Sequence, residues 1–200
     1  GEAAVARLCA GGADAHFVAL DLTDLANVAA AARTVAERFG RLDVLVNNAG
    51  VGGGQRPSQQ DLPAMRALFE TNVFGTIAVT QAFLPLLERS PAARIVNVST
   101  TLASLSLAAD PTHRITQWNA LFGYTASKVA INAFTVRLAY ELRPRHIKVN
   151  SACPGYVATD FNQGRGLRTV EQGAEIIVRL ATLADDGPTA GFRSEERRVG

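Results

Sequence analysis

Short apolar segments rich in β-branched residues alternate with longer helical segments along most of this chain. Four of the short segments are predicted strands, over residues 16–20, 43–46, 94–98 and 147–153. A strand that is followed by a helix and then by another strand is typical of βαβ units, which build a parallel sheet with helices on both faces. The alternation therefore predicts the α/β class.

Helical patterns fill the intervals between these strands. Asp24 or Thr23 is expected to cap an alanine-rich helix that ends at Gly40, because both side chains accept hydrogen bonds from free backbone N–H groups. The predicted helices cover about residues 2–10, 24–39, 61–89, 124–142 and 170–183.

Length, charge and cysteine content narrow the class of protein. A chain of 200 residues with 48% hydrophobic content suits one domain with a sizeable core. The net charge of +2 gives no reason to expect nucleic acid or an anionic membrane as a partner. The two cysteines do not form a disulfide framework, and no apolar run reaches the roughly 18 residues of a membrane span. We expect a soluble cytoplasmic protein with no metal site.

Polar clusters follow the predicted strands at the point where each strand ends. They are Asp21, Asn47-Asn48, Ser99-Thr100 and Pro154-Gly155. In open parallel sheets, ligands bind outside the carboxyl ends of the strands. The position of these clusters therefore predicts a small-molecule site along that edge of the sheet.

Tyr124 and Lys128 are four residues apart at the start of a predicted helix. This spacing puts the phenol and the ammonium on one helical face, one turn apart. A phenol with an ordinary pKa near 10 is a poor acid or base at neutral pH, and a nearby cation lowers that pKa. The pair is thus a candidate for proton transfer, although the spacing by itself is common in amphipathic helices.

Three motifs in this order, each after a strand or at a helix start, carry a family resemblance: Asn47-Asn48-Ala49-Gly50, Tyr124-x-x-x-Lys128, and Pro154-Gly155-x-Val157-x-Thr159. Together they resemble the short-chain dehydrogenase/reductase family, over residues 1–192. The resemblance implies a Rossmann-type doubly wound sheet in three α/β/α layers. Gly187-Pro188-Thr189-Ala190-Gly191-Phe192 further resembles the carbonyl-reductase-like branch.

The resemblance implies a role for each matching catalytic residue. Tyr124 corresponds to the general acid/base, and Lys128 to the residue that lowers the tyrosine pKa and binds the nicotinamide ribose. Asn72 corresponds to the asparagine that holds a proton-relay water. Thr100 stands where the family usually has a serine that orients the substrate carbonyl; its hydroxyl is retained, and its methyl group stiffens the side chain. Ser99 is the alternative for that role.

The resemblance also implies a dinucleotide cofactor, NADPH in preference to NADH, and a small carbonyl compound as substrate. The implied cofactor-binding residues are Asp21, Leu22, Asn48, Ala49, Gly50, Tyr124, Lys128, Pro154, Gly155, Val157 and Thr159. Other members of the family act on sugars, steroids or acyl thioesters, or sense dinucleotides without catalysis, and these remain alternatives. A homo-oligomer of the full-length parent is compatible with the same resemblance.

Several features of the family pattern do not occur in this chain. The first two strands are missing, so we expect the strand at residues 16–20 to have no neighbouring strand. The glycine-rich phosphate loop is also missing, so we expect the chain on its own to be inactive. Residues 193–200 form a charged tail without a strand pattern, so the last strand is also expected to be missing. This tail resembles a translated sequencing adapter; a genuine polar terminus is the alternative.

Overall fold

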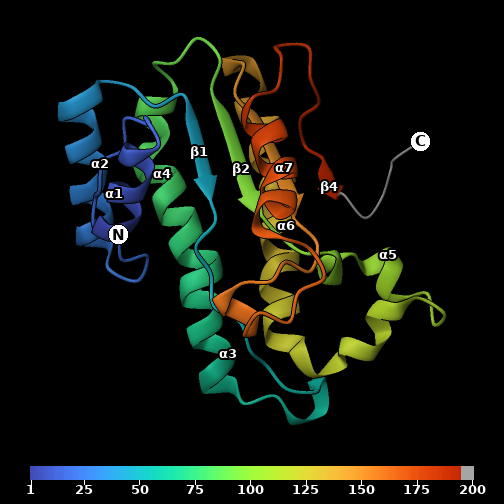
Figure 1. The fold of residues 1–200 in the computed structure, drawn as a ribbon. Coiled ribbons are helices and arrows are strands. Elements are labelled where there is room, and N and C mark those ends of the chain that lie inside the picture. Colours follow the sequence, from blue (N-terminus) through green and yellow to red (C-terminus); the bar gives the residue numbers. More distant parts are fainter. Residues whose placement is uncertain (195–200) are drawn as a thin grey trace.

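A four-stranded parallel sheet forms the centre of the molecule in the computed structural model, which describes residues 1–194 (Figure 1). The strands are β1 (Val44–Asn47), β2 (Arg94–Val98), β3 (Lys148–Cys153) and β4 (Phe192–Ser194), and they lie in the order β1-β2-β3-β4. Each neighbouring pair is parallel. The α/β class with a parallel sheet is therefore confirmed.

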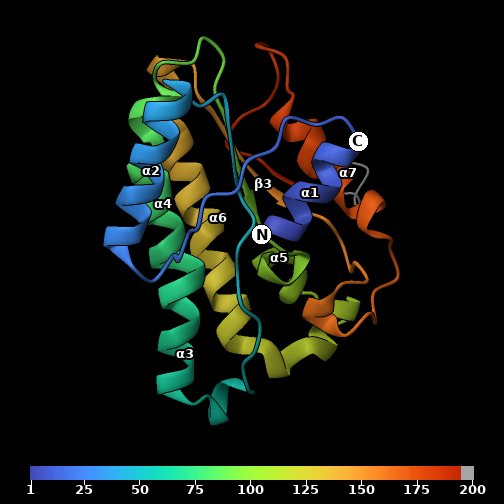
Figure 2. The same ribbon diagram turned by 60° about the vertical axis from the view of Figure 1, so that its left-hand side comes forward.

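Helices cover both faces of this sheet, as Figures 1 and 2 show from two directions. α4 and α6 pack on one face, α7 packs on the other, and α2 lies outside α4. The helices are α1 (Glu2–Ala10), α2 (Leu25–Phe39), α3 (Leu62–Phe69), α4 (Thr76–Leu87), α5 (Leu105–Ala108), α6 (Phe122–Leu142) and α7 (Val170–Ala181). None of the helices within residues 1–194 has both the length and the apolar character that crossing a lipid bilayer requires.

Alternating side chains of β2 and β3 supply the core on each side of the sheet. This alternation follows from the two-residue period of a strand. Toward α4 and α6, the buried side chains are Leu87, Ile95, Leu138, Leu142 and Val149. Toward α7, they are Val96, Ala152, Ile176 and Leu180.

A row of polar side chains crosses the same sheet among these apolar residues. Asn47, Asn97 and Ser151 stand opposite one another on β1, β2 and β3. Asn47 Nδ2 donates to Asn97 Oδ1 (2.8 Å), Asn97 Nδ2 donates to Thr135 Oγ1 on α6 (2.8 Å), and Ser151 Oγ donates to the same hydroxyl (2.9 Å). Asn47 Nδ2 also donates to Thr80 Oγ1 on α4 (3.0 Å). The row thus connects the sheet to both helices of this face.

Two strand predictions are wrong. Residues 16–20 form no strand, because no described strand lies beside them to accept their backbone hydrogen bonds; instead Val18 packs against the cluster formed by α2 and α4. A last strand does occur, because Phe192–Ser194 pairs with Ser151–Cys153, so Arg193 and Ser194 belong to the sheet rather than to a tail. The rest of the predicted tail, residues 195–200, lies outside the described residues.

The predicted helix over residues 61–89 is divided. α3 ends at Phe69, a π-helical segment covers Glu70–Gly75, and α4 continues from Thr76. π-Helical turns inside helices occur frequently at functional sites. Here the widened turn contains Asn72, one of the predicted site residues.

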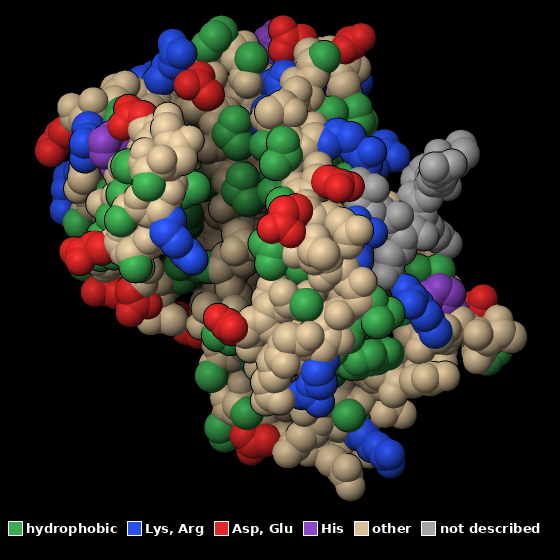
Figure 3. Space-filling model, viewed as in Figure 1, with side chains coloured by type: hydrophobic (Ala, Val, Ile, Leu, Met, Phe, Trp, Pro, Cys, Tyr) green, Lys and Arg blue, Asp and Glu red, His purple; other side chains and the backbone are tan. Residues whose placement is uncertain are grey.

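The N-terminal elements lie beside the β1 edge of the sheet. α2 begins at its cap Asp24, whose carboxylate accepts from Ala26 N and Asn27 N, as expected from the sequence. α1 buries none of its side chains. In Figure 3, a hollow with hydrophobic side chains on its floor separates the N-terminal elements on the left from the central part of the molecule.

Candidate active site

The loop that follows β1 lies against the start of α6. Tyr124 N donates to Gly53 O (3.2 Å), and Phe122 N donates to Gln55 O (3.2 Å). At Gly54, φ is 136°, and an added Cβ would lie 2.9 Å from Gly123 N, so this close approach requires glycine. The glycine-rich stretch therefore allows two segments that are far apart in the sequence to meet at the candidate catalytic tyrosine.

Lys128 is buried, with 5% of its surface exposed, and Nζ donates to Val98 O at the end of β2 (2.8 Å). Burial lowers the pKa of this ammonium from 10.5 to about 8. Nζ lies 5.9 Å from the centre of the Tyr124 ring. A Cβ added to Gly50 would lie 3.5 Å from Nζ, so the backbone at Gly50 passes directly beside the lysine.

Asn72 is completely buried in the π-helical segment, and its side chain holds the loop after β1 in place. Its Oδ1 accepts from Val51 N (2.8 Å), and its Nδ2 donates to Val51 O (2.9 Å) and to Ser127 Oγ (3.0 Å). Ser127 Oγ in turn donates to Tyr124 O (2.7 Å). The structure thus brings Asn72, Tyr124 and Lys128 together, as the sequence predicts.

The pKa of Tyr124 differs from the expectation that Lys128 lowers it. Burial, followed by the neighbouring Cys153 thiol, raises the pKa of the phenol to about 12. The ring of Phe161 lies 5.9 Å from the Tyr124 ring, centre to centre, and contributes to this burial. Removal of water from around the phenol is therefore the main cause of the shift, and Tyr124 is protonated at neutral pH.

Two hydroxyls follow β2, and they differ in exposure. Ser99 is 3% exposed, and its Oγ has no hydrogen-bond partner among the described residues. Thr100 is partly exposed, and its Oγ1 accepts from Leu102 N (3.3 Å). Because that oxygen acts as an acceptor, its own O–H remains able to donate to a substrate oxygen. Exposure therefore favours Thr100, in agreement with the sequence expectation.

The segment after β3 carries the predicted nicotinamide-binding residues. Asn162 holds this segment in its present shape, because Asn162 Nδ2 donates to Val157 O (2.7 Å) and Asn162 Oδ1 accepts from Thr159 N (3.2 Å). Pro154 and Gly155 form the turn that leads into it, with φ of 79° at Gly155. Phe161 of the same segment packs on Gly52, in front of Tyr124.

These features fit the nicotinamide half of a dinucleotide. Lys128 has two N–H donors besides the one used by Val98 O, and Gly50 leaves the space beside it clear of a side chain. Thr159 contributes a hydroxyl, and the exposed Phe161 would have to turn aside to uncover the phenol. The residues around Lys128 are therefore suited to hold a nicotinamide ribose.

The residues predicted to contact adenosine lie nearer the N-terminal elements. The carboxylate of Asp21 is exposed and accepts from Thr23 N (2.9 Å) and Thr23 Oγ1 (2.7 Å), and these bonds lower the pKa of Asp21. Leu22 packs directly against Gly75 at the end of the π-helical segment. Asn48 and Ala49 are exposed after β1. Asp21 is thus available to a ligand, whereas Leu22 is first of all a packing residue.

Sequence reasoning did not identify three residues of this site. Ser127 bridges Asn72 and Tyr124, and Phe161 covers the catalytic ring. The N–H of Val51 donates to Asn72 Oδ1, and the C=O of Val51 accepts from Asn72 Nδ2. The position of Ser127, one residue before the lysine in the motif, offered the clearest signal. The other two contacts join residues that are distant in the sequence.

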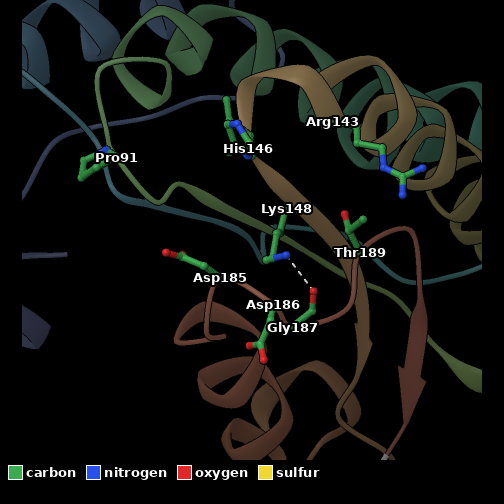
Figure 4. A pocket seen from close by; sticks show the side chains of 9 residues that line it. Pro91, Arg143, His146, Lys148, Asp185, Asp186, Gly187 and Thr189 are labelled. Carbon is green, nitrogen blue, oxygen red and sulfur yellow. Dashed lines mark hydrogen bonds between the residues drawn. The ribbon is translucent and has the colours of Figure 1, made fainter.

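A cavity of about 510 Å³ lies away from this site. It lies at the amino end of β3, and Figure 4 shows Arg143, His146, Lys148 and Asp186 around it. Lys148 Nζ is bound to Gly187 O across it (2.7 Å). Since the candidate catalytic residues follow the carboxyl ends of the strands, we assign the chemistry to the Tyr124 site.

Known proteins share both the sequence and the fold of this chain. The sequence profile described as short chain dehydrogenase matches residues 1–169. Short-chain dehydrogenase anuI of Penicillium roqueforti is 41% identical over 169 residues, which cover 82% of this chain and 67% of that protein. (-)-Isopiperitenone reductase of Mentha piperita is 33% identical, over 92% of this chain and 80% of that protein.

Among solved structures, the NADPH-bound carbonyl reductase from chicken fatty liver superimposes with a TM-score of 0.83 at 27% identity. The match covers 97% of this chain and 80% of that one. The fold, the motifs at the strand ends and the profile match agree with one another. The chain belongs to the short-chain dehydrogenase/reductase family of oxidoreductases.

Proposed function

We propose that the protein reduces the carbonyl group of an aldehyde or ketone to an alcohol, with NADPH as the hydride donor and Tyr124 as the general acid. The observation that carries this proposal is the buried cluster of Tyr124, Lys128 and Asn72 behind the carboxyl ends of β1 and β2. The family supports the reaction type, and its similarity to carbonyl reductases supports the reductive direction.

Reduction of a carbonyl needs a proton on oxygen as hydride reaches carbon. With a pKa of about 12, Tyr124 is protonated at neutral pH and carries the proton to be donated, and the charge of Lys128 would have to stabilise the phenolate as it forms. The O–H of Thr100 would donate a second hydrogen bond to the same oxygen and hold the carbonyl in position. After transfer, the phenolate would be stabilised by Lys128 until it regains a proton, in our proposal through a water held at Asn72.

NADPH, when bound, supplies the hydride. In our proposal Lys128 binds the nicotinamide ribose, while Val157 and Thr159 bind the carboxamide and Pro154-Gly155 shapes its approach. Asp21 and Leu22 would contact the adenine, and Asn48, Ala49 and Gly50 the adenosine ribose. A preference for NADPH over NADH is supported by the similarity to the chicken carbonyl reductase, which holds NADPH.

The test measures the oxidation of NADPH, of NADH and of reduced nicotinamide mononucleotide with a panel of aldehydes and ketones, by the chain itself, which is expected to be inactive with the dinucleotides, and by the chain extended with the family's glycine-rich loop segment. The mononucleotide tests the nicotinamide half of the site by itself. Tyr124→Phe is expected to lower the rate by about 10²-fold or more. The matched control is Tyr140→Phe on the same helix, since Tyr140 is 62% exposed. Full activity of Tyr124→Phe, or an equal loss in Tyr140→Phe, would overturn the proposal.

A further inference from the structure

We propose that Thr76 is a positioning residue of the candidate active site, whose hydroxyl holds the π-helical turn (Glu70–Gly75) in the shape that lets Asn72 reach Val51. This role rests on the proposed function, because Asn72 serves the reaction that we assign to Tyr124. Thr76 lies directly after the turn, at the start of α4, and is 4% exposed.

The hydroxyl of Thr76 takes the place of a main-chain bond of the regular α-helix. In an α-helix, the N–H of residue 76 would donate to the carbonyl oxygen of residue 72. Here the N–H of Thr76 donates to Val73 O, and Thr76 Oγ1 donates to Asn72 O (2.9 Å). Because a buried carbonyl without a partner is costly, the hydroxyl stabilises the chain where its geometry departs from that of an α-helix.

Thr182 shows how a threonine behaves at a regular helix end. Its hydroxyl also donates to the carbonyl four residues earlier, Val178 O (2.8 Å). The N–H of Thr182 donates to the same oxygen (2.9 Å), so Val178 O does not depend on the hydroxyl for a partner. At Thr76 the N–H is directed to a different carbonyl, and the hydroxyl therefore has the larger effect on local structure.

Thr76 is itself bonded to the sheet through a second threonine. Thr76 O accepts from Thr80 Oγ1 (2.8 Å), and Thr80 Oγ1 accepts from Asn47 Nδ2 (3.0 Å). Asn47 is the last residue of β1 and belongs to the polar row. Both threonines are buried, so these bonds are shielded from water. Directional bonds, and not apolar packing alone, thus fix the π-helical turn relative to the sheet.

The same bonds hold both ends of the loop after β1. At the start of the loop, Asn47 is bonded to α4. Four residues later, the N–H and C=O of Val51 are both bonded to the side chain of Asn72 (2.8 and 2.9 Å). Gly50, which passes beside the candidate catalytic lysine, lies between these two points. A shift of the π-helical turn would move Val51 and Gly50 together, so Thr76 would set the space proposed for the nicotinamide ribose.

Amide hydrogen exchange of the chain itself tests this role without any cofactor. Thr76→Val removes the hydroxyl and keeps the shape of the side chain. We expect the N–H of Val51 to exchange about fivefold or more faster than in the unaltered chain, because the turn that carries Asn72 loses a hydrogen bond. The reference is the N–H of Arg94, which donates to Asp43 O at the opposite end of β1 and β2 (2.9 Å) and should change much less.

Two further variants separate positioning from a general loss of stability. Thr76→Ser keeps a hydroxyl and is expected to keep the exchange of Val51 slow. Thr182→Val removes a hydroxyl whose acceptor retains its main-chain donor, and should also leave Val51 slow. If Thr76→Val does not fold, Thr76→Ala compared with Thr76→Ser isolates the same hydroxyl. Equal acceleration at Val51 and Arg94 would overturn the inference, as would equal exchange of Val51 with and without the hydroxyl at position 76.

The catalytic consequence is measured on the chain extended with the glycine-rich loop segment. Thr76→Val is expected to lower kcat for NADPH-dependent carbonyl reduction about tenfold and to change KM for the carbonyl compound little, because the reacting groups are displaced while the substrate still binds. Thr76→Ser should restore most of the lost kcat, and Thr182→Val should leave kcat unchanged.

These results distinguish failure of the role of Thr76 from failure of the proposed function. If exchange at Val51 responds as expected but no carbonyl compound is reduced, the positioning of Asn72 stands and the reaction is wrong. If carbonyl reduction is observed and Thr76→Val has the kcat of the unaltered protein, the reaction stands and the role of Thr76 is wrong.

Discussion

Replacement of Lys128 by methionine is expected to remove most of the alkaline pH dependence of folding stability. The ammonium is desolvated in the folded protein, and burial moves its pKa from 10.5 to about 8. In the unfolded chain the same group keeps its ordinary pKa. Between these two values the unfolded chain holds a proton that the folded protein has released, so stability rises with pH across this window.

The size of the effect follows from the displacement of the pKa. Each pKa unit corresponds to about 1.4 kcal/mol, so the change from 10.5 to about 8 amounts to about 3 kcal/mol over the whole window. Tyr124 acts in the opposite sense at higher pH. Folded Tyr124 keeps its proton up to about 12 and the unfolded phenol loses it near 10, so stability falls as pH rises from 10 to 12. The free energy of unfolding should therefore be highest near pH 10.

The measurement is urea-induced unfolding at intervals from pH 8 to pH 10. For the unaltered protein, we expect the free energy of unfolding to increase by about 2 to 3 kcal/mol over this range. Lys128→Met is expected to give a nearly flat profile. Lys148→Met is the control, because it removes the other lysine of the chain, whose Nζ binds Gly187 O at the opposite end of β3.

Two results would refute this reasoning. One is a flat profile for the unaltered protein, which would mean that Lys128 is hydrated in solution and that its ammonium is not desolvated as the structure has it. The other is a flat profile for Lys148→Met, which would assign the pH dependence to the wrong lysine.

Two further substitutions test the contacts around the catalytic tyrosine. Asn72→Leu leaves the N–H and C=O of Val51 without their partners and should lower the free energy of unfolding by about 2 to 4 kcal/mol. The control Asn48→Leu, at an exposed position, should change the free energy of unfolding little. Urea unfolding at neutral pH compares the two variants, and equal losses would contradict the assignment. Phe161→Ala exposes the Tyr124 ring to water and should shift the pKa of Tyr124 from about 12 toward 10. The pKa is measured as the pH of the phenolate absorbance change that is lost in Tyr124→Phe. If Phe161→Ala leaves that pH unchanged, Phe161 does not shield the phenol.

Local sequence patterns predicted β1, β2 and β3 well, but they predicted a strand at residues 16–20 that does not form and missed β4 at the other edge of the sheet. β2 and β3 are runs of buried residues whose pattern is visible without knowledge of their neighbours. Residues 16–20 have a similar apolar pattern but form no strand, because pairing depends on a neighbouring strand that a local pattern does not reveal. β4 shows the reverse: its short Phe-Arg-Ser sequence looks unlike a strand, and its hydrogen bonds to β3 make it one.

In the candidate site too, some features were predictable from the sequence and others were not. The spacing of Tyr124 and Lys128 on one helix predicted their proximity, because the period of a helix is fixed. Asn72 was placed by its motif, yet the π-helical turn around it and its bonds to Val51 were not visible in the sequence. The pKa of Tyr124 was predicted with the wrong sign, since the degree of burial is a property of the packed structure.

The polar row of Asn47, Asn97 and Ser151 raises the free energy of sheets in which the strands pair out of register. A slip of one residue between β1 and β2 or between β2 and β3 would turn an amide or hydroxyl away from α4 and α6 and toward the apolar surface of α7. Each buried amide left without a partner would cost about 1 to 3 kcal/mol. Strands made only of valine and isoleucine would tolerate such a slip far better. The row therefore makes the native alignment of the strands the one that satisfies these amides.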